Sequence, residues 1–590
     1  MTRSNNKLQQ FCRTIFLATI FLLPLKLGSM LLPGIPHALP EDLFAAIINP
    51  LPTSFFTIWS ALMLLITLAA YGFPAVLSWK NPAGKLLLLF LLLPIAALLG
   101  FVNPDNVGSA IIELEYLLGV SSFAAAAAII MHSEPLAFRN KIANSIAAGT
   151  ICTAIAGAYQ YFYGFDELKK FIEAQEKLHN ITFPPELKAR AYDVRTYATF
   201  TFASALAGFL ALAGAFTVVK AFRWGDRFEP VKLSQKLFAV LAFILAGGIF
   251  LTTKGRSAFL AVIAAAAITG FIRLKSRKLK LLIFAAAVAV IVAGAYYIHY
   301  AGRGFGSMTE RVGYLQTSVK MLIAHPFCGG GWGSFAGYHA LYKNFGNEEL
   351  AKDPHNIIAA FASQTGAVGG LLIALLLIFT LCNSAKRMKQ DFSPENMAIF
   401  FGLSAFSLHI LMDLDWQVPA LMAYYTVFAF LACGTNTDQG VQRKKIPAIL
   451  LMFSGVIAAI GGIHWLLADN SFGAMLSASG QEIGTYSVAK SSYEVDLAAE
   501  KALTYAPYSA VIYNAWALDK LRRNELLQAE KLFLKTIEIA PKSHAAHKSL
   551  SNVYTLLGKK DLAAKHAQIA DRLFPYRNTV INKQKVLQNE

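Results

Sequence analysis

The stretch LLLLFLLLPIAALLGFV, residues 86–102, decides the fold class of this chain. It contains no charged side chain, and it is bounded by Lys85 on one side and by a polar segment from Asn103 on the other. A helix needs an apolar run of roughly 17–25 residues to cross the hydrocarbon core of a bilayer. The stretch therefore predicts a transmembrane helix.

Runs of the same kind recur along the chain to about residue 467. Of the 590 residues, 56% are hydrophobic and 15% are charged, which is typical of a helical membrane protein. We predict an all-α, polytopic transmembrane bundle of about thirteen spans. The predicted spans are 12–32, 54–77, 86–102, 109–131, 142–163, 196–220, 237–253, 257–272, 281–299, 356–382, 396–412, 417–434 and 446–467.

The basic residues predict how the bundle is oriented. The formal net charge is +18, and most of the Lys and Arg excess lies in short loops on one side of the predicted bundle. Because short cytoplasmic loops are enriched in Lys and Arg, we expect the N-terminus inside and residues 468–590 outside. This distribution explains the charge without a nucleic-acid partner.

The tail after residue 467 is polar and contains a repeat. The pairs Ala506-Pro507, Ala540-Pro541 and Phe574-Pro575 are spaced by 34 residues, which is the tetratricopeptide period. Repeats of this kind form a small α-solenoid that usually presents a concave surface to a protein partner. The alternative is that the tail only caps the membrane body.

Ionisable residues gather at one depth of the predicted bundle, at the outer ends of spans or in outer loops. Charge in or near hydrocarbon costs roughly 2.5–3.5 kcal/mol per residue, so charges at a shared depth usually serve a function. Arginines and a histidine on one face suggest chemistry on a lipid-borne anion. The residues concerned are Arg195, Arg256, Arg311, His355, Asp413 and Asp415.

The largest outer loop, 300–355, carries two further signals. The run Gly329-Gly-Gly-Trp-Gly333 predicts a backbone that bends closely and offers N–H groups to an anion. The sequence Pro354-His355-Asn356 predicts a helix start with His355 in its first turn, where unpaired N–H groups favour phosphate.

The order of these motifs resembles the bacterial O-antigen ligase and O-antigen polymerase family. The resemblance covers residues 195–435, and in the segment after Arg195 it departs from the family pattern by Ala198, Ala203 and Ser204. The matching motifs are Gly255-Arg-Ser-Ala, Arg311-Val-Gly-Tyr, Ala324-His-Pro-Phe-Cys-Gly-Gly-Gly, His355-Asn and Gly366-Ala-Val-Gly.

The resemblance implies a glycan transferase at the periplasmic face of a bacterial inner membrane, as in lipopolysaccharide biosynthesis. Such an enzyme moves a glycan from undecaprenyl pyrophosphate to an acceptor hydroxyl, with inversion and without cofactor or metal. His355 is then the general base, and Arg256 and Arg311 stabilise the pyrophosphate leaving group. Further candidates for substrate binding are Arg195, Asp413, Asp415, Trp332 and Asn356.

The acceptor is left open by the sequence: lipid A–core defines a ligase, a growing glycan a polymerase, and a protein an O-oligosaccharyltransferase. Two alternative functions of a different class are a transporter of the lipid-linked glycan and a membrane-anchored scaffold. The predicted domains are 1–195, an O-antigen ligase-like core 196–435, a last span 436–467 and the periplasmic repeat domain 468–590.

Each candidate residue also has a purely structural explanation. His355 can cap a helix, Arg256 can extend to the membrane interface, and Arg311 can be a solvated loop residue. Asp413 and Asp415 can form an exposed acidic turn instead of orienting His355 or binding sugar. Trp332 and its aromatic neighbours can anchor the protein at the interface instead of stacking on sugar rings.

Overall fold

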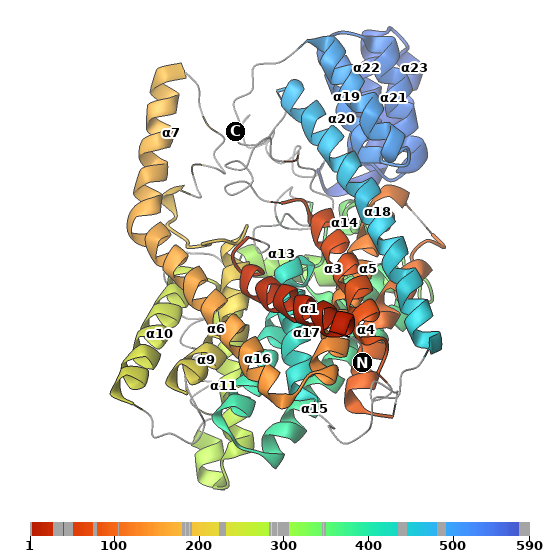
Figure 1. The fold of residues 1–590 in the computed structure, drawn as a ribbon. Helices are drawn as coiled ribbons and strands as arrows, with labels where there is room; N and C mark the ends of the chain where they lie inside the picture. The colour runs from red at the N-terminus through yellow and green to blue at the C-terminus, as the bar shows by residue number, and fades with distance from the viewer. Residues whose placement is uncertain are drawn as a thin grey trace.

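The structure is a computed structural model. All secondary-structure elements among its described residues are helices. The described residues are 3–26, 51–74, 80–179, 191–223, 232–282, 306–344, 350–434, 445–480 and 491–577. Pro104 is not among them, and a few single residues between these ranges are described as well. This confirms the prediction of an all-α chain. Figure 1 shows a bundle of long helices with a smaller group of helices, α19–α23, at one end.

Nine helical segments in the described part of the chain are long and apolar enough to cross a membrane, which identifies a multi-pass membrane protein. Three further predicted spans, 12–32, 396–412 and 417–434, overlap α1 (Arg3–Leu22), α16 (Pro394–His409) and α17 (Pro419–Ala432). The predicted span 281–299 lies almost entirely outside the described residues, so the count of thirteen stays a prediction. The nine segments contain α3 (Thr53–Tyr71), α4 (Pro82–Leu99), α5 (Val107–Ser133), α6 (Leu136–Tyr159), α9 (Ala203–Phe222), α10 (Leu233–Thr252), α11 (Arg256–Arg273), α15 (Ile357–Gln390) and α18 (Lys445–Ala478).

Helix α5 lies at the centre of the bundle. Every residue from Phe123 to Met131 is at most 1% exposed, and this stretch contains five consecutive alanines, Ala124–Ala128. Small side chains let membrane helices approach closely. Helices α3, α4, α17 and α18 all pack against α5, so this helix joins the early spans to the late ones.

The predicted outer loop 300–355 contains two helices, which the sequence analysis did not expect. They are α13 (Gly306–Ala324) and α14 (Phe335–Tyr342). Their facing sides form a small apolar cluster that includes Tyr314, Met321 and Tyr338. The segment buries Tyr314, Met321 and Tyr338 between its own helices, while Val312, Val319 and Ile323 of α13 remain exposed apolar residues.

Helix α15 is interrupted at Gly366, whose φ is 80° and ψ is −178°. The segment around Gly329 packs into this break: Gly330 N donates to Ser363 O at 2.8 Å, and Ala367 N donates to Pro326 O at 2.8 Å. A Cβ built on Gly329 lies 2.2 Å from the backbone of Gln364, so only glycine allows the contact.

For three of the four glycines, this packing corrects the prediction that the run offers its N–H groups to an anion. Gly329 N donates to His325 O, Gly330 N to Ser363 O, and Gly333 N to the side chain of Gln364. The glycines therefore serve close backbone packing within the bundle.

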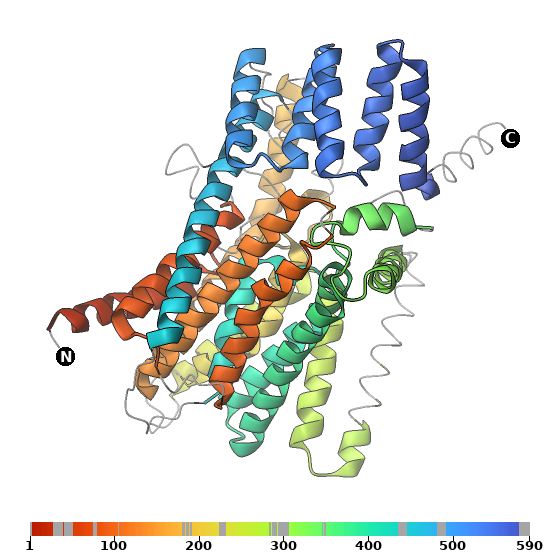
Figure 2. The ribbon, with the colours of Figure 1, turned by 90° about the vertical axis from the view of Figure 1, so that its right-hand side faces the viewer.

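The tail is built directly onto the last membrane helix. Helix α18 continues without a break to Ala478, eleven residues beyond the predicted end of the span at 467, and its last turns share a core with α19 (Ser492–Tyr505). The following helices are α20 (Ala510–Arg522), α21 (Leu526–Ile539), α22 (His544–Leu556) and α23 (Lys560–Leu573). Figure 2 shows these helices side by side at one end of the bundle.

Each of the three repeated prolines, Pro507, Pro541 and Pro575, stands two residues after a helix end. Proline at this place prevents the helix from continuing, and the chain reverses into the next helix. The helical hairpins have the layout that the repeat predicts, while the assignment to the tetratricopeptide class stays a prediction.

We expect Gly366→Ala to destabilise the protein by about 1–3 kcal/mol or more, because a Cβ there would lie 2.2 Å from Phe327 O at a positive φ. The control is Gly214→Ala in α9, where a Cβ meets nothing within 4 Å. Thermal unfolding of both variants in detergent tests this. Equal melting temperatures would show that the packing at the break is not tight.

Candidate active site

The centre of the candidate site is the carboxylate of Asp413, in the turn between α16 and α17. Asp413 is only 5% exposed. Its Oδ2 accepts a hydrogen bond from Ser257 Oγ at 3.1 Å and lies 3.5 Å from Arg311 Nη2. Its Oδ1 lies 3.7 Å from His355 Nδ1. One buried anion thus contacts residues from α11, α13 and the segment before α15.

His355 stands just before α15 in a strained backbone conformation. Its φ is +54°, in the left-handed region that non-glycine residues rarely occupy. Its backbone N–H donates to Asp353 Oδ1 at 2.7 Å, which holds this conformation in place. Such strain persists where the surrounding structure fixes it, and it is frequent at functional sites.

The predicted helix start is present, but His355 lies outside it. Helix α15 begins at Ile357, and Asn356 is its N-cap: Asn356 Oδ1 accepts from Ala359 N at 2.9 Å. The Nδ2 atom of Asn356 donates to Leu411 O at 2.8 Å. Both polar atoms of Asn356 therefore have a partner within the fold, and its role in substrate binding stays a prediction.

An aromatic platform supports the imidazole ring of His355. Tyr314, three residues after Arg311 on α13, stacks on this ring with centroids 5.4 Å apart and an angle of 22°. His339 of α14 packs edge-on against Tyr314 at 5.1 Å and its Nδ1 lies 3.1 Å from Thr317 Oγ1. Burial, followed by the charge of Lys343, lowers the pKa of His339 to about 4, so this histidine is neutral at pH 7.

The second aspartate of the turn, Asp415, is completely buried beside the first. His409 Nε2 lies 2.7 Å from Asp415 Oδ2, and Ser204 Oγ donates to Asp415 Oδ1 at 3.3 Å. Gly208 of α9 leaves room for the pair, since a Cβ there would lie 2.8 Å from Asp415 Oδ2. The alternative of an exposed acidic turn for Asp413 and Asp415 is therefore wrong.

The environments of the acidic residues push their pKa values apart. Burial alone would raise the pKa of Asp413, but His355 and the charges of His409 and Arg311 outweigh it and hold that pKa well below its usual range. Burial, followed by the charge of Asp413, raises the pKa of Asp415. Such a divergence between neighbouring carboxyls is characteristic of catalytic sites.

Arg256 is the first residue of α11 and directly precedes Ser257, so it adjoins the Asp413 cluster. Its side chain is exposed and has no ion pair among the described residues. Arg195 contacts the turn before α11: its Nε donates to Thr253 O at 3.2 Å, and its side chain is 44% exposed. Arg195 thus contacts the turn that leads into α11, and Arg256 is the first residue of that helix.

Trp332 does not line this site. Its ring is 1% exposed and packs edge-on against Phe361 at 4.8 Å and Trp416 at 6.3 Å. A buried indole cannot stack on a sugar ring, so the prediction of Trp332 as a substrate contact is corrected to a core residue.

Sequence reasoning missed four residues at this site: Ser257, Tyr314, Asp353 and His409. A signal was present for Tyr314, because Arg311 and Tyr314 are three residues apart and lie on the same face of a helix. No group of three or more His, Cys, Asp and Glu side chains in the described ranges is arranged to hold a metal ion. The expectation of a metal-free reaction stays a prediction.

Together these features define a polytopic helical membrane protein with a polar, partly strained site that brings arginine, histidine and buried carboxylates together. Residues 240–374 match the family model described as O-antigen ligase. The matched segment includes Arg256, Arg311 and His355 and supports the resemblance drawn from the motifs. No curated protein matches the chain.

We predict a pH-dependent stability that Asp353 controls. Burial raises its pKa to about 6, from an ordinary value of about 3.9. Between these pH values the folded protein holds a proton that the unfolded chain has lost, so stability falls as pH rises and is constant above about 6. Asp353→Asn removes this decrease.

The measurement is the melting temperature of wild type and Asp353→Asn in detergent between pH 4 and 8. The difference, variant minus wild type, should grow by several degrees up to pH 6 and then level off. A difference independent of pH would show that Asp353 is not protonated in the folded protein.

Proposed function

We propose that this protein is a membrane glycan transferase of the O-antigen ligase type, which transfers a glycan from a polyprenyl pyrophosphate to an acceptor hydroxyl. The observation that carries the proposal is the meeting of Arg311 and His355 at the buried Asp413, with Arg256 one residue from Ser257 of the same cluster. The family match over residues 240–374 supports it.

His355 is the general base in this mechanism. Its Nδ1 faces Asp413, which leaves Nε2 on the opposite side of the ring for the acceptor hydroxyl. The carboxylate of Asp413, with its depressed pKa, stays ionised and stabilises the imidazolium that forms. Stacking on Tyr314 fixes the plane of the ring. Base catalysis of this kind contributes typically 10²–10⁴-fold.

The arginines act on the leaving group. The acceptor oxygen loses its proton to His355 Nε2 and attacks the anomeric carbon, and the bond from this carbon to the pyrophosphate oxygen breaks with inversion. The electron pair leaves with the pyrophosphate, whose charge Arg256 and Arg311 neutralise. Guanidinium groups suit this role because they stay charged and bind phosphate oxygens in a bidentate manner. Arg195 supplies a further cation beside Arg256.

The enzyme acts at the outer face of the bacterial inner membrane in this proposal, with the tail in the periplasm. The charge of the short loops supports this orientation. The tail also lies at the same end of the bundle as the site. Lys542 of the tail contacts Tyr338 of α14, and Tyr338 belongs to one apolar cluster with Tyr314, which stacks on His355. The site and the tail therefore face one compartment.

A transporter is less well supported. Transporters use broken helices whose freed backbone groups bind substrate or ions. The break in α15 at Gly366 is instead filled by the glycine segment, which takes up backbone groups on both sides of the break. The polar groups of the site also lie at helix ends and in the segments between helices.

We expect His355→Ala to lower the transfer rate by about 10²–10⁴-fold while donor binding is retained, because the base is lost and the arginines remain. Asp413→Asn should also lower the transfer rate, since it removes the negative charge that faces His355 Nδ1. The assay follows transfer from a purified polyprenyl-pyrophosphate glycan. His464→Ala, on α18, is the matched control and should keep wild-type activity. Wild-type rates in His355→Ala would exclude the base assignment.

The acceptor is best identified from a deletion of the gene. For a ligase, we expect loss of all long chains on lipid A–core and accumulation of lipid-linked polymer. A ladder with a single repeat would instead indicate a polymerase. Unchanged polysaccharide with a protein that has lost its glycan would indicate an O-oligosaccharyltransferase. Analysis of surface polysaccharide and of lipid-linked intermediates separates the three outcomes.

A further inference from the structure

Lys542 connects the tail to the membrane body. It follows Pro541 in the turn between α21 and α22, and its Nζ lies 2.5 Å from Asp105 Oδ2, in the segment before α5. The same ammonium group lies 3.9 Å from the ring centroid of Tyr338 in α14. One tail residue therefore binds two separate segments of the body through its charge.

Tyr338 passes this contact on toward the site. The residue is 3% exposed, its hydroxyl lies 2.8 Å from His325 Nε2, and it belongs to one apolar cluster with Tyr314. His339, the next residue, packs against Tyr314, and Tyr314 stacks on His355. A short series of packed rings thus leads from Lys542 to the proposed base.

Lys542 contacts α14 through its charge, and α23 of the tail also packs against α14. A cleft of about 280 Å³ separates parts of the two bodies, and residues of both, among them Ser334 and Asn514, line it. A second polar contact joins the end of the tail to the segment after α14, where Tyr576 Oη donates to Gly346 O at 2.6 Å. Helix α14 packs on α13 through the apolar cluster, and the two polar contacts with the tail add to its fixation from the other side.

We propose that Lys542 is a positioning residue for the transfer reaction. By holding Tyr338 against the tail, it fixes α14 and Tyr314, and thereby the ring plane of His355. The tail is then part of the outer wall of the active site, in addition to any partner it binds. The effect on rate rests on the proposed function, while the effect on the geometry of His355 does not.

Lys542→Ala should lower kcat about tenfold with an unchanged KM for the lipid-linked donor, because a slightly displaced base slows the chemical step and leaves the pyrophosphate contacts intact. Lys542→Arg keeps the charge and the contact with the ring, and should keep kcat within about twofold. If the wild-type enzyme has transfer activity and Lys542→Ala has the same kcat, the proposal is overturned.

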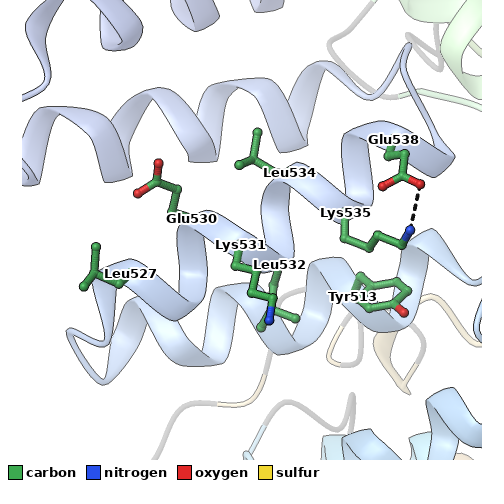
Figure 3. Close-up of a pocket in the computed structure, with 8 residues that line it drawn as sticks. All are labelled: Tyr513, Leu527, Glu530, Lys531, Leu532, Leu534, Lys535 and Glu538. Atoms are coloured by element: carbon green, nitrogen blue, oxygen red, sulfur yellow. Dashed lines mark hydrogen bonds and ion pairs between the residues drawn. The ribbon is translucent and has the colours of Figure 1, made fainter.

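The matched control is Lys535→Ala. Lys535 belongs to the same domain and forms an ion pair with Glu538 at 2.7 Å. It lines a groove of about 530 Å³ whose lining residues all belong to α20 and α21 (Figure 3). This variant removes a tail lysine without touching α14 and should keep the wild-type kcat.

A covalent replacement of the contact provides a rescue. A Cβ built on Gly337 lies 3.3 Å from Lys542 Cβ, close to the Cβ separation of about 3.5–4.5 Å in disulfides. The double variant Gly337→Cys/Lys542→Cys should be active when oxidised and as slow as Lys542→Cys when reduced. Equal rates in both states, with the crosslink verified on a gel, would contradict the proposal.

A second readout does not depend on transfer. His355 is 25% exposed, so diethyl pyrocarbonate can modify it, and peptide mass spectrometry measures the rate. We expect modification several times faster in Lys542→Ala than in wild type or Lys535→Ala, because the stacking on Tyr314 is loosened. If Lys542→Ala is modified faster but the wild-type protein shows no transfer activity, the proposed function is refuted and the positioning role is supported. Equal modification rates would overturn the positioning role.

Discussion

The burial of the Asp413 carboxylate is the constraint on which the site depends. An ionised carboxyl taken out of water is several kcal/mol unfavourable unless it is paired and hydrogen-bonded. Asp413 satisfies this requirement with Ser257, Arg311 and His355, which come from three segments far apart in sequence. The same attraction that stabilises the buried charge therefore assembles the site. The fold and the geometry of the candidate site have one common cause here.

The helical framework could be predicted from sequence because the membrane leaves few options. A backbone in hydrocarbon must satisfy its own hydrogen bonds, so each long apolar run has to be a helix. The run 86–102 corresponds to α4, Pro82–Leu99, and 109–131 corresponds to α5, Val107–Ser133. Boundaries were less accurate where a helix continues into water. Helix α18 does so because its last turns, at Phe472 and Met475, enter the core of the tail.

The candidate site could be predicted only in part, since motif order reveals which residues belong together but not how each is used. His355 and Arg311 were found, and the structure places both at Asp413. Trp332 was misassigned because an aromatic residue in a glycine-rich outer segment has the same pattern whether it faces sugar or packs on Phe361. The role of the glycines was missed for a related reason. Their close packing depends on the break in α15, which lies more than thirty residues later in the chain.

The continuity of α18 determines how the tail relates to the site. A domain joined through a flexible linker samples many positions, and its contacts must overcome the entropy of fixing it. Here the last membrane helix runs directly into the core of the tail, so the orientation of the tail is largely set by the bundle itself. A single ion pair such as that of Lys542 with Asp105 then needs to select only among small displacements. This is why one polar contact in the turn between α21 and α22 can adjust the position of a neighbouring helix that is already packed on the membrane body.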